Sequence, residues 1–238
     1  MLYTLEDRPS DSPFVERIWR AQIERAGDLL SIAMSHWEMV VSRYQDKTYM
    51  TVRGPETKAT TLPVTVVGTE FFGIRFKVGT VMPDLPASAL VDGDVNLPDA
   101  SSKSFWLNGS AWQFPSYENA DTFVDRLVRQ DLLAREPVVE AALYGQLNDL
   151  SIRTARRHFR RTIGLSQSTI RQIERARYAT VLLREGMSIL EVVYEVGYYD
   201  QPHLTRSLKY FIGQTPTQIL KNNGLEQLSL LYKTEPLR

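Results

Sequence analysis

Four arginines recur within eight residues of the C-terminal half, at a spacing that suits recognition of a polyanion. They are Arg153, Arg156, Arg157 and Arg160. On an α-helix they form one stripe, adjacent to an apolar stripe of Ile152, Ala155, Phe159 and Ile163. The arginines repel one another, and a bound polyanion would relieve that repulsion; guanidinium groups also match guanine edges and phosphates. A basic surface helix without a ligand explains this stripe equally well, so the segment alone does not decide.

A second pair of helices, predicted nearby, favours DNA binding. Ser188 and Glu191 have the spacing of a capping box, and Gly197 ends the helix that they begin. Asp200 can cap the next helix, with Pro202 in its first turn. One side of that helix is apolar, and the other carries Gln201, Pro202, His203, Thr205, Arg206, Lys209 and Tyr210. A helix, a glycine turn and a helix with a polar face are typical of a helix-turn-helix unit.

The remaining helices of this region can hold the two units together. Ser151 is a suitable N-cap for the arginine-bearing helix, and Gly164 ends it. The segment Gln167–Leu183 predicts a connecting helix of about 25 Å, long enough to place two reading helices near adjacent major grooves. Thr215 and Gln218 have the spacing to begin a closing helix.

These residues resemble a known family. This part of the chain is similar to the AraC/XylS family of bacterial transcription regulators. The similarity lies in the stretch Ser151–Thr180 and in the run Gly197-Tyr198-x-Asp200-Gln201, Leu204-Thr205-Arg206 and Gly213-Gln214-Thr215-Pro216. The resemblance implies a double helix-turn-helix domain whose two reading helices enter successive major grooves. It implies base-facing positions at Arg153, Arg156, Arg157, Gln201, Pro202, His203, Thr205 and Arg206. We expect Thr154, Arg160 and Lys209 to contact DNA as well, with Arg160 and Lys209 at phosphates. Two features differ from the family pattern. Pro202 has no N–H, so it cannot donate a hydrogen bond to a base. The turn Gly145–Leu150 is longer than is usual in the family.

The charge distribution agrees with this assignment although the whole chain has no net charge. Residues 1–136 contain 14 Lys and Arg against 19 Asp and Glu, whereas residues 137–224 contain 12 against 7. A basic module needs only a local excess of positive charge to attract phosphate.

The N-terminal part predicts a β-sandwich or cupin-like domain. Glu38–Tyr44 and Lys47–Arg53 form a hairpin pattern around Gln45 and Asp46, and Phe72, Ile74, Phe76 and Val78 alternate so that one strand face is buried. The segment is distantly similar to cupin-like sensing domains, which implies a small-molecule pocket and a dimer interface. Pocket candidates are Trp37, Arg75, Trp106 and Trp112. We expect most of the aromatic residues to be core, with one or two left for a pocket, and we expect Arg75 to face solvent unless it points inward to an anionic ligand.

Enzymatic functions have little support in the sequence. The chain has no cysteine, no phosphate-binding glycine loop and no serine-hydrolase motif. His36 and Glu38 could share a strand face, but two candidate ligands do not make a metal site, and a hydrogen-bonded structural histidine is the simpler reading. We therefore expect neither catalysis nor a cofactor nor a bound metal.

The sequence as a whole predicts an α+β multidomain protein. The expected parts are a β-rich sensing or dimerisation domain (1–118), a linker helix (119–136), a DNA-binding domain with two helix-turn-helix units (137–224) and a tail (225–238). We expect a cytoplasmic, ligand-responsive regulator, with duplex DNA, RNA polymerase, a small-molecule effector and a second copy as partners, and no membrane association. Two alternatives stay open: a cupin-type enzyme fused to a DNA-binding module, and a constitutive DNA binder whose N-terminal half only dimerises.

Overall fold

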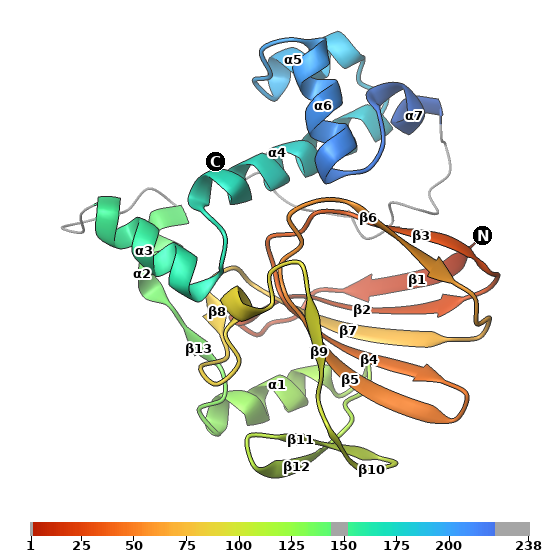
Figure 1. The fold of residues 1–238 in the computed structure, drawn as a ribbon, viewed down its shortest axis with the longest axis vertical. Coiled ribbons are helices and arrows are strands. Elements are labelled where there is room, and N and C mark those ends of the chain that lie inside the picture. The colour runs from red at the N-terminus through yellow and green to blue at the C-terminus, as the bar shows by residue number, and fades with distance from the viewer. Residues whose placement is uncertain (1, 144–151, 222–238) are drawn as a thin grey trace.

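A computed structural model of the chain describes residues 2–143 and 152–221 (Figure 1). Its N-terminal part is built mainly of strands and its C-terminal part of helices, as predicted. The predicted N-cap Ser151, the turn Gly145–Leu150 and the tail 225–238 lie outside the described residues. The strands are β1 (Tyr3–Arg8), β2 (Val15–Ile23), β3 (Gly27–Ser31), β4 (Glu38–Tyr44), β5 (Lys47–Arg53), β6 (Thr60–Val64), β7 (Glu70–Phe76), β8 (Thr80–Val81), β9 (Asp94–Asn96), β10 (Asp99–Ser101), β11 (Ser104–Leu107), β12 (Ser110–Gln113) and β13 (Ala134–Arg135).

The main sheet has six antiparallel strands in the order β1-β2-β7-β4-β5-β9. The predicted hairpin is confirmed, since β4 and β5 pair from Glu38 opposite Arg53 to Tyr44 opposite Lys47. Gln45 and Asp46 form the turn with φ values of 49° and 62°. Two successive left-handed residues suit a tight hairpin because their twist matches that of the flanking strands.

The six-stranded sheet is covered on both faces. Phe72, Ile74 and Phe76 point to one face and pack into a core with α1 (Ala120–Arg129) and with Phe105 and Trp112 of the small sheet β10-β11-β12. The alternate residues of β2, β4, β5 and β7 line a cavity beneath the two-stranded sheet β3-β6. The predicted buried face of β7 is therefore confirmed, and the ribbon β3-β6 shields its second face as well.

The predicted linker helix is shorter than expected and belongs to the β-rich part. Helix α1 ends at Arg129, and Asp131 then takes a left-handed conformation (φ 56°) that reverses the chain. Residues 134–135 pair with β8 as strand β13. The apolar residues of α1 (Ala120, Phe123, Val124 and Leu127) are buried in the core of the β-rich part and do not form an exposed apolar face. This removes the observation that would have favoured a purely dimerising N-terminal half.

The helical part surrounds one long helix, α4 (Figure 1). Apolar residues of α4, including Ile170 and Ile173, join those of the neighbouring helices in a common core. Among the described residues, no helix combines the length and apolar character needed to cross a membrane. The helices are α2 (Pro137–Leu143), α3 (Ile152–Thr162), α4 (Gln167–Arg184), α5 (Ile189–Glu195), α6 (Gln201–Phe211) and α7 (Pro216–Lys221), and a single 3₁₀ turn, η1 (Ala87–Ala89), lies in the β-rich part.

The helix boundaries follow the predicted signals. The Ser188 side chain accepts a hydrogen bond from the Glu191 backbone N–H, and the Glu191 carboxylate accepts one from the Ser188 backbone N–H. Hydrogen bonds to the carboxylate from the Ser188 hydroxyl and from the Ser188 backbone N–H lower the pKa of Glu191. Gly164 and Gly197 have φ values of 81° and 73°, the left-handed conformation that ends a helix. The predicted turns are thus confirmed wherever the structure describes them.

Replacing Ser188 with alanine is expected to lower the free energy of unfolding by about 1 kcal/mol, because the N-terminal amides of α5 lose a hydrogen-bond acceptor. Urea unfolding of the wild type and the variant measures this difference. Thr217→Ala, an exposed substitution in the first turn of α7, provides the control and is expected to change the midpoint much less. Equal effects of the two substitutions would show that the capping box contributes nothing specific.

Candidate nucleic-acid interface

Helix α3 presents its arginines outward, as the periodicity predicted. Phe159 and Ile163 are buried in the helical core, at 1% and 5% exposure. Arg153, Arg156, Arg157 and Arg160 are exposed, and Thr154 is half-buried. The structure shows no ion pair between these four arginines and any other described residue. Their charges are therefore available to an external anion.

A basic groove of about 1420 Å³ runs between α3 and α4. Arg156, Arg157 and Arg160 line one side of it, and Arg171 and Arg175 line the other. Glu174 and Glu195 also reach its lining, so positive charge dominates without being exclusive. Arg153 and Thr154 do not line it.

The arginines of α4 were missed because that segment was interpreted only as a connector. A signal was present: Arg171 and Arg175 are four residues apart, so they share one helix face. Gln167, Ser168 and Gln172 also line the groove and also escaped notice.

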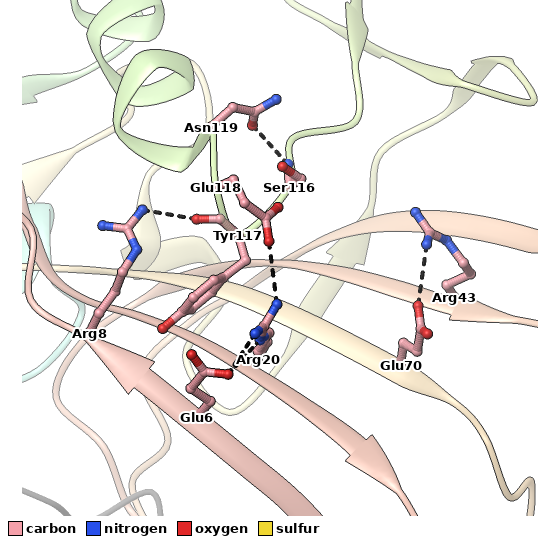
Figure 2. Close-up of polar contacts among 9 residues, drawn as sticks. All are labelled: Glu6, Arg8, Arg20, Arg43, Glu70, Ser116, Tyr117, Glu118 and Asn119. Carbon is pink, nitrogen blue, oxygen red and sulfur yellow. Dashed lines mark hydrogen bonds and ion pairs between the residues drawn. The ribbon is translucent and has the colours of Figure 1, made fainter.

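Several arginines of the β-rich part are arranged differently. Figure 2 shows Arg20 between Glu6 and Glu118, at 2.6 and 3.3 Å, and Arg43 beside Glu70 at 3.2 Å. Arg8 likewise donates to the carbonyl of Tyr117 at 2.9 Å (Figure 2). On this side of the sheet the positive charges are matched by carboxylates within the protein. The arginines of α3 have no ion pair among the described residues, and they differ in this from Arg8, Arg20 and Arg43.

Helix α6 is the second predicted reading helix, and its local structure supports that role. Asp200 caps it by accepting a hydrogen bond from the His203 backbone N–H at 2.6 Å. Leu204 and Leu208 are fully buried. The remaining predicted contact residues lie on the other side: Gln201, Pro202, Arg206 and Lys209 are exposed, and His203 and Thr205 are half-buried.

Two contacts fix the turn between α5 and α6. The hydroxyl groups of Tyr198 and Ser207 lie 3.0 Å apart, and both residues are buried. The guanidinium of Arg175, which lines the basic groove, stacks over the ring of Tyr198 at 4.4 Å. Helix α4 therefore connects the groove at α3 directly to the second helix-turn-helix unit.

The β-rich part touches both units. The backbone N–H of Ala33 donates to the carbonyl of Phe211 at 2.8 Å, and that of Ala59 donates to Tyr210 at 2.9 Å, so the end of α6 is bonded to two loops. At the other unit, α3 contacts η1, and a side chain added at Gly164 would collide with Val91. The two helix-turn-helix units are thus held by the same N-terminal part.

Of the predicted pocket residues, only Arg75 lines the cavity beneath β3-β6. Trp37 stacks on Phe76 at 4.1 Å in the opposite core, and its indole N–H donates to the Thr80 carbonyl. Trp112 is also core, at 1% exposure, whereas Trp106 is 46% exposed. These three placements correct the prediction, because alternate strand residues face away from the cavity or out of the protein.

Arg75 does not face solvent. It is 4% exposed and donates to the Glu38 carboxylate at 2.6 Å. Burial opposes its charge, but the carboxylates of Glu38 and Glu16 raise the pKa of Arg75 above its usual value. The ion pair, not solvent, therefore satisfies this guanidinium.

His36 is part of the same polar cluster and has structural contacts. Its Nε2 lies 2.9 Å from the Glu16 carboxylate, and its Nδ1 lies 3.3 Å from the Ser35 hydroxyl. Burial alone would raise the pKa of Glu16, but His36, Arg75 and Arg177 together hold it well below its usual range. Within the described residues, no group of three or more side chains could hold a metal ion.

Comparison with known proteins agrees with the helical part. Residues 146–222 match the family model of the helix-turn-helix domain. No curated protein and no solved structure is similar enough to the chain to count as a match. The match spans α3 to α7, the helices that carry the basic groove and the second polar helix. The matched residues thus make up an AraC-type helix-turn-helix domain, and a domain of this type indicates a DNA-binding transcription regulator.

Proposed function

We propose that this regulator reads two adjacent major grooves of DNA with α3 and α6, and that a small molecule controls its affinity for DNA. The observation that carries the proposal is the pair of exposed polar helix faces joined by α4; the arginines on the first face have no ion pair with another described residue. Phosphate contacts by arginine supply affinity that depends on salt and not on sequence. Base contacts from both helices discriminate between DNA sequences, with about 1–3 kcal/mol of binding free energy for each bidentate contact.

The length of α4 suits this geometry. Its 18 residues span about 27 Å at 1.5 Å per residue. The turns at either end extend that distance, and adjacent major grooves on one face of DNA are about 34 Å apart. Arg153, Thr154, Arg156, Arg157 and Arg160 serve the first groove; Gln201, Pro202, His203, Thr205, Arg206 and Lys209 serve the second.

Control by a ligand is supported by the cavity in the β-rich part. Its volume of about 450 Å³ lies within the range of small-molecule sites, and most of its lining is apolar. We further propose that the protein works in the cytoplasm as a homodimer that contacts RNA polymerase. Domain limits at 118, 136 and 224 remain predictions of the sequence, although α1 packs with the first of these parts.

Selection of bound duplexes from a random pool, at near-physiological salt, tests the proposal. We expect the wild type to recover two sequence blocks separated by about one helical turn. Arg157→Ala should lose preference in one block only, and Arg206→Ala in the other, because each helix reads its own groove. A single block, or loss of preference in the same block for both variants, would contradict two-groove reading.

Lys103→Ala serves as the control, since it removes one exposed positive charge from the β-rich part. It should leave both blocks intact. If Arg157→Ala weakens binding equally for selected and random duplexes, Arg157 contacts phosphate and not a base.

A further inference from the structure

The cavity beneath β3-β6 is lined by both parts of the chain. Its walls are the inner residues of the six-stranded sheet and the ribbon β3-β6, which lie one above the other in Figure 1. Arg177, from the long helix α4 of the DNA-binding domain, also lines it. Any molecule in this cavity can therefore contact the DNA-binding domain directly.

Most polar groups of the lining are already satisfied by the protein. Arg75 donates to Glu38 at 2.6 Å, deep beneath the ribbon. Glu56 accepts hydrogen bonds from Arg53 at 2.7 Å and from the Ser31 hydroxyl at 2.6 Å. These groups close the polar end of the cavity without needing a ligand.

Two residues of the lining carry donors that are not satisfied within the described part of the chain. The indole N–H of Trp19 has no acceptor among the described residues, and neither have Nε and Nη2 of Arg177. Within the described part of the chain, Arg177 donates one hydrogen bond, from Nη1 to the Ala33 carbonyl at 3.4 Å, and its Nε lies 3.8 Å from the Glu174 carboxylate. Trp19 is 7% exposed and Arg177 1%. Buried donors without acceptors are costly, so these two call for acceptors from a bound molecule.

The charges nearby indicate that the acceptor is uncharged. Each carboxylate of the cluster has a basic partner: Glu38 has Arg75, Glu174 has Arg177, and Glu16 has His36 at 2.9 Å. An additional anion would enter a buried cluster without a cation of its own. A carbonyl or ether oxygen would satisfy the donors without that cost.

The wall of the cavity is also bonded to the second reading helix. Leu30, Ile32 and Met34 line the cavity, and Ala33 between them donates to the carbonyl of Phe211 at the end of α6. A side chain added at Gly213, just after α6, would collide with Leu30 at 2.8 Å. A shift of this wall must therefore be passed on to α6.

We propose that the cavity binds an uncharged, largely apolar small molecule whose oxygen accepts hydrogen bonds from Trp19 and Arg177, and that binding changes the position of α6 and so the affinity for DNA. This inference rests on the proposed ligand control. It specifies the class of ligand and the contacts through which binding in the cavity affects α6.

Titration calorimetry of the full chain with octan-2-one, an uncharged acceptor, tests ligand binding without DNA. Octanoate at pH 8 is the anionic probe of equal chain length. We expect octan-2-one to bind more tightly than octanoate. Trp19→Phe, which keeps an aromatic ring but removes the N–H, should weaken binding of octan-2-one about fivefold.

Two further variants make the result specific. Trp112→Phe removes a buried indole N–H that also lacks an acceptor but lies in the opposite core, so it should leave binding unchanged. Arg177→Lys keeps a positive charge near Glu174 and should also weaken binding. Unfolding midpoints confirm that each variant is folded. No binding of octan-2-one, tighter binding of octanoate, or equal affinity of Trp19→Phe and the wild type would overturn the proposal.

Fluorescence anisotropy with the selected duplex then tests the route to α6. Saturating octan-2-one should change the affinity of the wild type for DNA, and Trp19→Phe should need about five times more ketone for the same change. Ketone binding without any change in DNA affinity would overturn the route. A protein that binds the ketone but selects no duplex would overturn the proposed two-groove reading and leave the ligand site standing.

Discussion

Replacing Glu38 with alanine is expected to lower the free energy of unfolding by about 3–5 kcal/mol, because it leaves the guanidinium of Arg75 buried without its partner. The pair joins β4 to β7 at 2.6 Å, and the two side chains are only 3% and 5% exposed. Arg75 then retains the cost of desolvation without the compensating attraction. Urea unfolding followed by fluorescence measures the loss.

The same two strands supply the control. Arg43 and Glu70 also pair across β4 and β7, but their side chains are 61% and 53% exposed (Figure 2). Glu70→Ala should therefore cost less than about 1 kcal/mol. Replacing Glu38 and Arg75 together with methionine should recover most of the loss, since no charge is then left unpaired. A double variant as unstable as Glu38→Ala would show that packing, not charge, causes the effect.

Replacing Arg156, Arg157 and Arg160 together with alanine is expected to abolish tight DNA binding near physiological salt. These arginines line the groove between α3 and α4 and have no ion pair with another described residue. If each contacts a phosphate, the slope of log affinity against log salt concentration should fall by about 3 in magnitude. Fluorescence anisotropy with selected and random duplexes, at several salt concentrations, measures both quantities.

A charge-matched triple variant separates the groove from general electrostatics. Arg20, Arg43 and Lys103 lie on the β-rich part, and the first two are paired with carboxylates (Figure 2). Replacing these three with alanine removes the same charge but should change the salt slope by much less than 1. Equal losses in the two triple variants would mean that net charge, and not the groove, attracts DNA.

The sequence by itself determined those elements that depend only on residues close together in the chain. The hairpin β4-β5 follows from alternation around Gln45 and Asp46, which adopt left-handed conformations easily. Helix caps and helix ends also depend only on neighbouring residues, as at Ser188, at Asp200 and at the glycines after α3 and α5. The helix-turn-helix region could therefore be predicted from the sequence. The outward arginines of α3 follow from helix periodicity alone.

Tertiary structure decided the features that depend on distant contacts. The helix after residue 119 stops at Arg129 because Asp131 reverses the chain, although Leu132 continues the apolar period into the core. Arg75 is buried because the ribbon β3-β6 covers its face of the sheet, and no alternation pattern shows which ribbon covers which face. Arg177 reaches the cavity through helix α4, more than a hundred residues along the chain from Glu38 and Arg53. The candidate DNA-binding surface could therefore be predicted from neighbouring residues, whereas the candidate ligand site exists only where distant segments meet.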